Sequence, residues 1–377
     1  MHGKGTMGKI MRALGLMSGT SLDGIDVAYI ETDGESRVHR GHARTFDYTS
    51  EMRRMLINAL AEAKSLSQRD ERPAALAAAE LALTESNAEA VLDFLRLHAI
   101  AASAIDVIGF HGQTVLHRPD AGMTVQLGLG KLLADMTQCP VVYDLRAGDV
   151  AAGGQGAPLV PVYHRALTSA LPDRPLAIVN IGGVANVTWI GADGRMIAFD
   201  TGPGNALLDD WMIKTSGVAR DENGFTSSRG RVAEDVVRFY LSHSFFAEPP
   251  PKSLDRNAFF WDLVEGLSVE DGAATLAAFT AGAIAKSREH LPQEPALWII
   301  CGGGRRNKTI MSQLAGLVQN AVVPAEAVGL DGDSVEAEAW AYLAVRSLKG
   351  LPITFPGTTG VASPMTGGVH VMPKRAH

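Results

Sequence analysis

Short apolar runs along the chain are joined in pairs by small, polar turns. Residues 13–17 and 25–31 flank a turn that is rich in hydroxyl groups and glycine. Residues 176–181 and 187–190 flank a pair of glycines, and another apolar run follows at 196–199. Runs of this length bounded by turn residues are typical of β-hairpins. The pattern therefore predicts two glycine-bearing hairpins, one in each half of the chain.

Longer segments repeat their apolar residues at the spacing of an amphipathic helix. These segments are 51–66, 74–98, 129–136, 206–214, 231–243, 273–291, 308–318 and 334–348. Short apolar runs at 107–110, 141–143 and 297–301 are predicted to be buried strands. Strands that alternate with helices are typical of α/β proteins.

The two hairpins, each followed by helices, indicate a duplicated α/β unit. A chain of 377 residues is long enough for two domains that each bury a core. Residues 146–156 contain four glycines, and we interpret them as a crossing between the domains. We therefore expect an N-terminal domain of residues 11–145 plus 352–377 and a C-terminal domain of residues 146–351.

Composition and charge narrow the range of partners. The net charge is −7 and the chain has no long run of Lys or Arg, which argues against a nucleic-acid partner. Its two cysteines form no disulfide framework. The N-terminus lacks the apolar core of a signal peptide, and no apolar stretch reaches the roughly 18 residues of a membrane span. We expect a cytoplasmic protein with no membrane partner, of a size compatible with a homodimer.

The first hairpin turn is the first candidate for chemistry. It places Ser18, Thr20 and Ser21 beside glycines and is followed by Asp23 and Asp26. A turn of small residues exposes successive backbone N–H groups, which can cradle phosphate oxygens, and either aspartate could hold Mg²⁺ through water. The alternative is an ordinary turn in which Ser and Asp bond local backbone. The rigid strands on both sides favour the phosphate interpretation.

Asp200 is the candidate for proton transfer. It follows a predicted strand and precedes Thr-Gly-Pro-Gly-Asn205, which opens a helix with Asn205 as its expected N-cap. A carboxylate at a strand end beside a glycine-rich turn can accept a proton from a nucleophile, although it could equally bond backbone donors there. We interpret Asp209 and Asp210 as part of a solvated helix face.

Three other segments are candidate binding sites. Gly302-Gly303-Gly304 follow a buried strand and could pack against adenosine, or form a simple turn. His111 and Gln113 follow the strand at 107–110, at the end where α/β proteins bind ligands, although a lone histidine is more often structural. Residues 144–158 carry acids, an arginine and glycines that suit a substrate cleft or a mobile linker. The chain has neither a P-loop nor protein-kinase motifs.

Together these motifs resemble the anhydro-N-acetylmuramic acid kinase family of the actin/hexokinase-like superfamily. The matching segments are Gly15-Leu-Met-Ser-Gly-Thr-Ser-Leu-Asp-Gly-Ile-Asp26, His111-Gly-Gln-Thr114, residues 144–158, Asn180-Ile-Gly-Gly-Val-Ala-Asn186, residues 199–205 and Cys301-Gly-Gly-Gly304. They occur in the family's order from residue 13 to about residue 360. The resemblance implies a two-domain fold of duplicated ribonuclease H-like units, with ATP and the active site in the cleft between the domains.

The resemblance also implies a reaction and the role of each residue in it. Asp200 matches the family's catalytic aspartate, which would take a proton from a water that attacks C1 of the 1,6-anhydro sugar. The freed O6 would then attack the γ-phosphate of ATP, which gives N-acetylmuramate 6-phosphate and ADP in cell-wall recycling. Residues implied to bind ATP are Gly19, Thr20, Ser21, Leu22, Asp23, Gly24, Ile25, Asp26, Asn180, Gly182, Gly183, Gly302, Gly303 and Gly304, with Asp23 reaching Mg²⁺ through water. Residues implied to bind the sugar are His111, Gln113, Asp144 and Glu336.

Two alternatives remain open at this point. One is a related kinase of the same fold that acts on a plain sugar or on a carboxylate. The other is an ATP-driven switch protein that is not a kinase.

Overall fold

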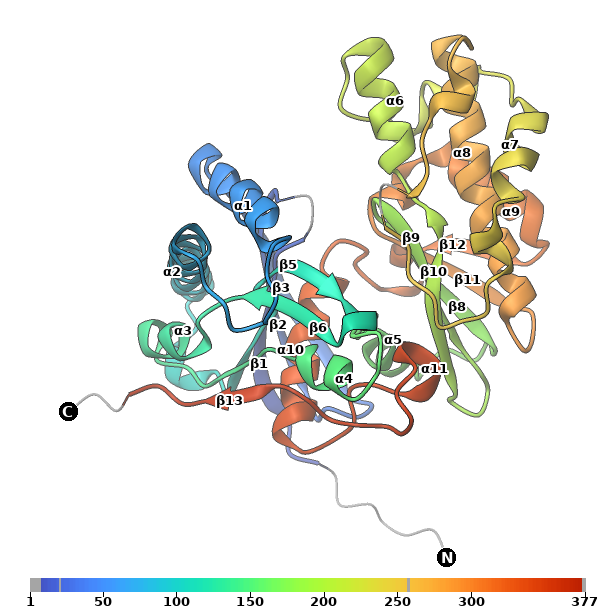
Figure 1. Ribbon diagram of the computed structural model, residues 1–377. Helices are drawn as coiled ribbons and strands as arrows, with labels where there is room; N and C mark the ends of the chain where they lie inside the picture. Colours follow the sequence, from blue (N-terminus) through green and yellow to red (C-terminus); the bar gives the residue numbers. More distant parts are fainter. Residues whose placement is uncertain (1–7, 20–21, 256–257, 375–377) are drawn as a thin grey trace, which may run out of the picture. The chain divides into compact units, whose positions relative to one another are not determined.

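The computed structural model describes residues 8–19, 22–255 and 258–374, which form two compact units (Figure 1). Unit 1 runs up to Ser169 and resumes at Ser334, and unit 2 is Ala170–Asp333. These boundaries differ from the expected ones, because residues 146–169 and 334–351 belong to unit 1. Residues 146–156, which we interpreted as a crossing between domains, lie inside unit 1 and include a short helix.

Unit 1 is built from eight strands and seven α-helices among the residues that the structure describes. They are β1 (Met11–Met17), β2 (Gly24–Thr32), β3 (Val38–Asp47), α1 (Ser50–Ala63), α2 (Ala74–Leu97), β4 (Val107–Phe110), β5 (Gln113–Arg118), β6 (Met123–Leu127), α3 (Gly130–Thr137), β7 (Val141–Tyr143), α4 (Ala147–Ala151), α5 (Pro161–Leu167), α10 (Val335–Leu348), α11 (Pro356–Thr359) and β13 (Val369–Val371).

Unit 2 contains β8 (Leu176–Ile181), β9 (Val184–Ile190), β10 (Met196–Pro203), α6 (Ala206–Ser216), α7 (Glu234–Leu241), α8 (Val269–Lys286), β11 (Leu297–Cys301), α9 (Lys308–Val318) and β12 (Ala321–Pro324). Helix α7 is shorter than the predicted segment 231–243, and α9 has the predicted bounds.

The two main sheets share one strand order. Unit 1 has the order β13-β7-β4-β1-β2-β3, and unit 2 has the order β10-β9-β8-β11-β12. In each sheet three consecutive strands pair antiparallel, and two later strands then add in parallel beside the first of them. Strand β13 is an addition at the edge of the first sheet. The predicted α/β fold of the actin/hexokinase type, built from two related units, is confirmed in these sheets.

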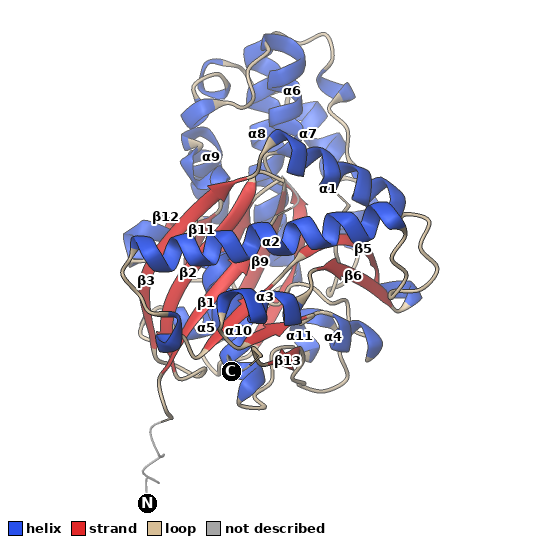
Figure 2. Cartoon of the chain, turned by 90° about the vertical axis from the view of Figure 1, so that its left-hand side faces the viewer, coloured by secondary structure: helices blue, strands red, loops and turns tan. Residues whose placement is uncertain are grey.

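Helices cover both faces of the sheet in unit 1, and Figure 2 shows α2 lying across one of these faces. Leu14 and Leu16 of β1 pack into a core with residues of α2 and α3. The residue between them, Gly15, faces α10 instead, because side chains alternate along a strand. A Cβ atom at Gly15 would lie 1.8 Å from the carbonyl oxygen of Ala337 in α10. Only glycine therefore allows the helix to pack this closely on the sheet.

The core of unit 2 lies between its sheet and helices α6, α7, α8 and α9. Helix α8 is nearly continuously apolar and is buried along most of its length, as expected for a helix at the centre of a layer. Side chains cap α8 and α9 at their N-termini: the hydroxyl oxygen of Ser268 accepts from Asp271 N, and Asn307 Oδ1 accepts from Thr309 N and Ile310 N. In the described part of the chain, no helix combines the length and the apolar character needed to cross a membrane.

Candidate functional site

The hairpin between β8 and β9 packs tightly against the turn that follows β10. Asn205 N donates to Gly182 O at 2.7 Å, and Gly204 N donates to Gly183 O at 2.9 Å. A Cβ atom at Gly204 would lie 2.3 Å from Gly182 O. Asn205 takes the expected N-cap position of α6, but its side chain bonds Ile181 O at 3.1 Å and not the helix. The hairpin tip and this turn therefore form one rigid backbone surface.

The three glycines after β11 lie against the same hairpin. Gly302 has a φ of +71°, and a Cβ atom there would lie 2.3 Å from Oδ1 of Asn180. A Cβ atom at Gly304 would lie 2.2 Å from the side chain of Ile181. All the residues of unit 2 that were predicted to bind ATP are thus close to one another. The result is a surface of backbone groups that a phosphate or a flat ring can approach closely.

A pocket of about 140 Å³ opens beside these glycines, and its lining includes Asn205, Asp209, Arg220, Gly303 and Arg306. Asp209, which we interpreted as part of a solvated face, contributes to this wall. A second pocket, of about 510 Å³, is lined by the neighbouring segments 223–228 and 308–313. Residues 220–228 were not predicted to form part of a site, although the run Asp221-Glu-Asn-Gly224 is typical of a turn.

Asp221 organises that missed segment. It is buried, and its carboxylate accepts hydrogen bonds from Thr226 N at 2.7 Å, from the Ser227 hydroxyl at 2.5 Å and from Asn307 Nδ2 at 3.3 Å. The wall of both pockets is therefore fixed to the N-terminus of α9.

Asp200 lies on β10 at a β-bulge, where the register with β9 shifts between Asp200 and Gly202. Gly202 has a φ of +149°, and a Cβ atom there would lie 2.8 Å from the Cβ of Ala283. Burial raises the pKa of Asp200 from 3.8 to about 7, and the hydrogen bond from Leu254 N opposes this rise. A carboxyl group with a pKa near neutrality is suited to accept a proton during a reaction.

Residues 252–254 run alongside Asp200 as a strap, a second feature that the sequence analysis missed. Asp200 N donates to Lys252 O at 3.0 Å, and Leu254 N donates to Asp200 Oδ2 at 2.8 Å. The ammonium group of Lys252 anchors the strap, since it donates to Phe245 O at 2.8 Å and lies 4.6 Å from the ring centroid of Phe245. The prolines at 249–251 marked an extended segment in the sequence, but nothing in it indicated which strand the segment would meet.

In unit 1 the first hairpin turn is fixed by side chains. The Ser18 hydroxyl donates to Gln113 Oε1 at 2.7 Å and lies 2.8 Å from the hydroxyl of Tyr48. Gln113 Nε2 lies 3.4 Å from Gly19 O. The predicted phosphate residues Thr20 and Ser21 lie outside the described residues. Gln113, which was predicted to contact the sugar, is buried and contacts the hairpin in this structure.

The other predicted residues of this hairpin differ in exposure. Asp23 is 68 % exposed and forms an ion pair with Arg53 at 3.9 Å. Asp26 accepts from the Thr45 hydroxyl at 2.5 Å. Leu22 and Ile25 are each buried in a hydrophobic core of unit 1, so only their backbone could contact a ligand. Gly24 begins β2, where a Cβ atom would lie 2.4 Å from a backbone oxygen of β3.

His111 and Arg146 form the centre of the predicted sugar side. The Arg146 guanidinium lies 3.3 Å from His111 Nε2 and 5.0 Å from the ring centroid of Trp340, and its Nη1 donates to Gly156 O at 2.8 Å. Burial, assisted by this cation, holds the pKa of His111 well below its usual range. His111 is therefore neutral, and its Nε2 accepts from the arginine.

Burial also lowers the pKa of Arg146 to about 10, while the charges of Glu336 and Asp149 oppose this change. Glu336 thus lies near enough to Arg146 to share an electrostatic environment with it. Asp144, in contrast, forms a bidentate pair with Arg69 at 2.7 and 2.8 Å. Its φ of +56° is an uncommon backbone conformation for a residue other than glycine.

Asp23 is the residue that was predicted to hold Mg²⁺ through water. Among residues 8–19, 22–255 and 258–374, no group of three His, Cys, Asp or Glu side chains could hold a metal ion. Mg²⁺ at nucleotide sites commonly takes only one or two carboxylates and bonds phosphate oxygens as well. An exposed hard carboxylate such as Asp23 fits that pattern.

Comparison with known proteins agrees with the motifs in the sequence. The family model described as anhydro-N-acetylmuramic acid kinase matches residues 11–373. A protein of that name from Agrobacterium fabrum is 52 % identical over 371 residues, which cover 97 % of this chain and 100 % of the relative. A protein of the same name from Azorhizobium caulinodans is 53 % identical over 369 residues, covering 96 % of this chain and 100 % of the relative.

Solved structures with a similar course of the chain are distant in sequence. The activator of 2-hydroxyisocaproyl-CoA dehydratase from Clostridium difficile, solved with bound ADPNP, has a TM-score of 0.47 and 14 % identity, covering 90 % of this chain and 96 % of that one. ROK hexokinase from Thermus thermophilus has a TM-score of 0.38 and 12 % identity, with 90 % and 99 % covered. The family match and the relatives of similar length decide the assignment: this chain is a kinase that belongs to the anhydro-N-acetylmuramic acid kinase family.

Proposed function

We propose that this kinase uses ATP and water to convert 1,6-anhydro-N-acetylmuramic acid into N-acetylmuramate 6-phosphate and ADP. We place the reaction in the cytoplasm, in cell-wall recycling. The observation that carries the proposal is Asp200, a partly buried carboxyl group whose pKa is raised to about 7. It lies at a bulge of β10, in the same unit as the glycine surface of the β8–β9 hairpin.

In the proposed reaction Asp200 accepts a proton from a water molecule as the water oxygen bonds to C1. The bond between C1 and O6 breaks, and its electron pair remains on O6. O6 then bonds to the γ-phosphorus of ATP, and ADP leaves. A base with a pKa near neutrality is ionised at the operating pH and still takes up a proton readily.

The proposed nucleotide site is the glycine surface formed by Asn180, Gly182, Gly183 and Gly302 to Gly304. A Cβ atom at Gly302 or Gly304 would clash with Asn180 or Ile181 of the hairpin, which supports a role for this loop in holding ligand atoms against the backbone. We assign Gly19 to Asp26 to the phosphates as well. Mg²⁺, held through water by Asp23, would supply neutralisation of the phosphate charge.

The proposed sugar residues are His111, Gln113, Asp144 and Glu336, to which we add Arg146. The guanidinium of Arg146 is held by Gly156 O and by stacking on Trp340, so it is preorganised for an anionic or polar group of the sugar.

The test is ADP release by the purified protein with Mg-ATP and one of three sugars: 1,6-anhydro-N-acetylmuramic acid, N-acetylmuramic acid or glucose. We expect stimulation by the anhydro sugar alone. Mass spectrometry should identify a product heavier than that sugar by one water and one phosphoryl group. Stimulation by another sugar would indicate a related kinase, and ADP release that no sugar changes would favour the ATP-driven switch.

A further inference from the structure

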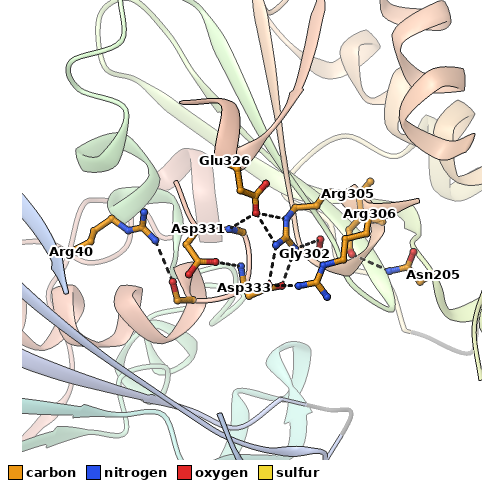
Figure 3. A network of polar contacts seen from close by, with 11 residues as sticks. Arg40, Asn205, Gly302, Arg305, Arg306, Glu326, Asp331 and Asp333 are labelled. Carbon is orange, nitrogen blue, oxygen red and sulfur yellow. Dashed lines mark hydrogen bonds and ion pairs between the residues drawn. The ribbon is translucent and has the colours of Figure 1, made fainter. Parts of the chain in front are cut away.

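Arg305 is a buried cation that directly follows the glycine surface. It lies in a 3₁₀ turn, Gly303–Arg306, and its side chain is only 6 % exposed. Arginine can donate in several directions at once from one rigid plane. Here the guanidinium contacts three different segments of unit 2 (Figure 3).

The first segment is the glycine loop itself, because Arg305 Nη1 donates to Gly302 O at 2.9 Å. The second is the turn after β12, where Arg305 Nε donates to Glu326 Oε1 at 2.8 Å. The third is Asp333, which accepts from Nη1 at 2.8 Å and from Nη2 at 2.9 Å. The bidentate geometry fixes the direction of the carboxylate as well as its distance.

Asp333 is the last residue of unit 2, and the chain passes into unit 1 at Ser334. The passage is bound to the glycine loop by its backbone too, since Gly302 N donates to Gly332 O at 3.2 Å. A Cβ atom at Gly332 would lie 2.4 Å from Nε of Arg305. Asp331 Oδ1 closes the turn by accepting from Asp333 N at 3.0 Å. Residues 331–333 therefore follow the position of the Arg305 side chain closely.

The first residue beyond the passage is held by unit 1. The Ser334 hydroxyl donates to Glu338 Oε1 at 2.9 Å, and Arg40 bonds both that carboxylate and the hydroxyl. Ser334 is therefore not a flexible connection that could take up a change in the direction of residues 331–333. It would be passed to helix α10, which begins at the next residue.

We propose that Arg305 is a positioning residue that joins the Gly302–Gly304 loop to the chain passage at 331–333, so that a nucleotide on the loop also orders the passage between the units. The proposal rests on the assignment of the glycine loop to ATP. The donors of this one guanidinium are shared among the loop, the β12 turn and the passage, so a single side chain joins the three segments. The two parallel hydrogen bonds from Arg305, which we call the fork, also hold the pKa of Asp333 below its usual value, so the carboxylate is ionised at neutral pH.

The test is hydrogen exchange on the full-length protein, with and without ADP, for peptides that cover residues 300–307 and 329–336. In the wild type we expect ADP to slow exchange in both peptides. In Arg305→Gln we expect faster exchange of both peptides without ADP, and ADP should then protect only residues 300–307. Arg288→Gln is the matched control, because Arg288 is a half-exposed arginine of the same unit that bonds Leu317 O and Glu294.

Steady-state kinetics provide a second readout that altered stability alone would not give. Arg305→Gln should raise KM for ATP on the order of 10-fold, within the usual range of coupling between sites, and should leave KM for the sugar nearly unchanged. Arg305→Lys keeps the charge but not the fork, so we expect an intermediate value. If Arg305→Gln does not fold, Asp333→Asn breaks the fork and leaves the contact with Glu326.

The outcomes separate this proposal from the proposed function. Protection of 300–307 by ADP in the wild type, with no change at 329–336, would overturn the coupling and keep the nucleotide site. Equal protection of both peptides in Arg305→Gln would also overturn the coupling. Absence of protection at 300–307 in the wild type would overturn both proposals.

Discussion

The third strands of the two main sheets occupy the same topological position and have different surroundings. β3 and β10 each lie at the edge of a sheet, antiparallel to the second strand of a hairpin, and each carries an aspartate: Asp47 at the end of β3 and Asp200 within β10. β3 is mostly exposed, whereas β10 is mostly buried under α8 and the segment around Phe246.

The comparison shows that the duplicated fold supplies two edge strands at the same place in the strand order, and that packing raises the pKa of a carboxyl group on only one of them. Asp47 is solvated. Asp200 is enclosed by the strap at Leu254 and by the bulge at Gly202, and burial raises its pKa. A carboxyl group becomes a useful base at neutral pH only when its surroundings disfavour its charge. We therefore attribute the raised pKa of Asp200 to the cover over β10.

The largest expected effect comes from removing the carboxylate of Asp200, with the same change at Asp47 as the comparison. Asp200→Asn should lower kcat by roughly 10²-fold or more, because the proton acceptor is lost, and ATP should still bind. Asp47→Asn should change kcat very little. Sugar-dependent ADP release measures both variants, and near-normal turnover of Asp200→Asn would remove that residue from its proposed role.

A smaller effect is expected from a methyl group on the glycine loop. Gly302→Ala places a Cβ atom 2.3 Å from Asn180 Oδ1 and should raise KM for ATP on the order of 10-fold, since one strained or displaced contact costs about 1–3 kcal/mol. Gly217→Ala is the control, because Gly217 also has a φ of +71° and has open space around it. If Gly217→Ala raised KM for ATP as much as Gly302→Ala does, the increase would come from a general effect of backbone strain and not from the contact with Asn180.

The pH dependence should show the burial of Asp200 directly. Turnover should fall as the pH drops through about 7, because the base becomes protonated. Lys252→Met removes the anchor of the strap and should let water reach Asp200, which lowers its pKa and moves the acidic limb to lower pH. A pH–rate profile measures the limb, and an unchanged limb in this variant would mean that the strap does not control the pKa.

The smallest effect concerns stability. Because the folded-state pKa of Asp200 is raised, the folded protein binds this proton more tightly than the unfolded chain does, and stability falls as the pH rises from about 4 to about 7. Asp200→Asn removes that penalty and should raise Tm by several degrees at pH 8, on the order of 2–4 °C per kcal/mol for a domain of this size. At pH 4 the wild type and the variant should melt alike. Equal melting at pH 8 would contradict a raised pKa.

The sequence predicted the local features of the fold well. The hairpins at 13–31 and 176–190 and the helix at 308–318 could be recognised because turn residues and helical periodicity act within a few residues of one another. Strand β3 was missed, since its exposed residues carry no apolar pattern. Unit 1 resumes at Ser334 and not at the expected residue 352, because α10 packs on Gly15, more than 300 positions away in the sequence.

The sequence predicted some residues of the candidate site, as it did the local features of the fold. Asp200 and the glycines could be singled out from their place after strands, and the structure brings Asn180, Gly182, Gly183 and Gly302 to Gly304 together. The strap at 252–254 and the role of Asp221 could not be predicted, because both depend on which distant backbone groups the segment meets. The contacts of Arg305 belong to the same class.

The insertion of unit 2 within the residues of unit 1 has a consequence for synthesis on the ribosome. Unit 2 is one continuous stretch, Ala170–Asp333, whereas the first sheet needs α10 and β13 from the end of the chain. Domains generally fold as units during synthesis. All residues of unit 2 therefore leave the ribosome before those of unit 1 are complete. One face of the N-terminal sheet stays uncovered until residues 335–348, which form α10, emerge.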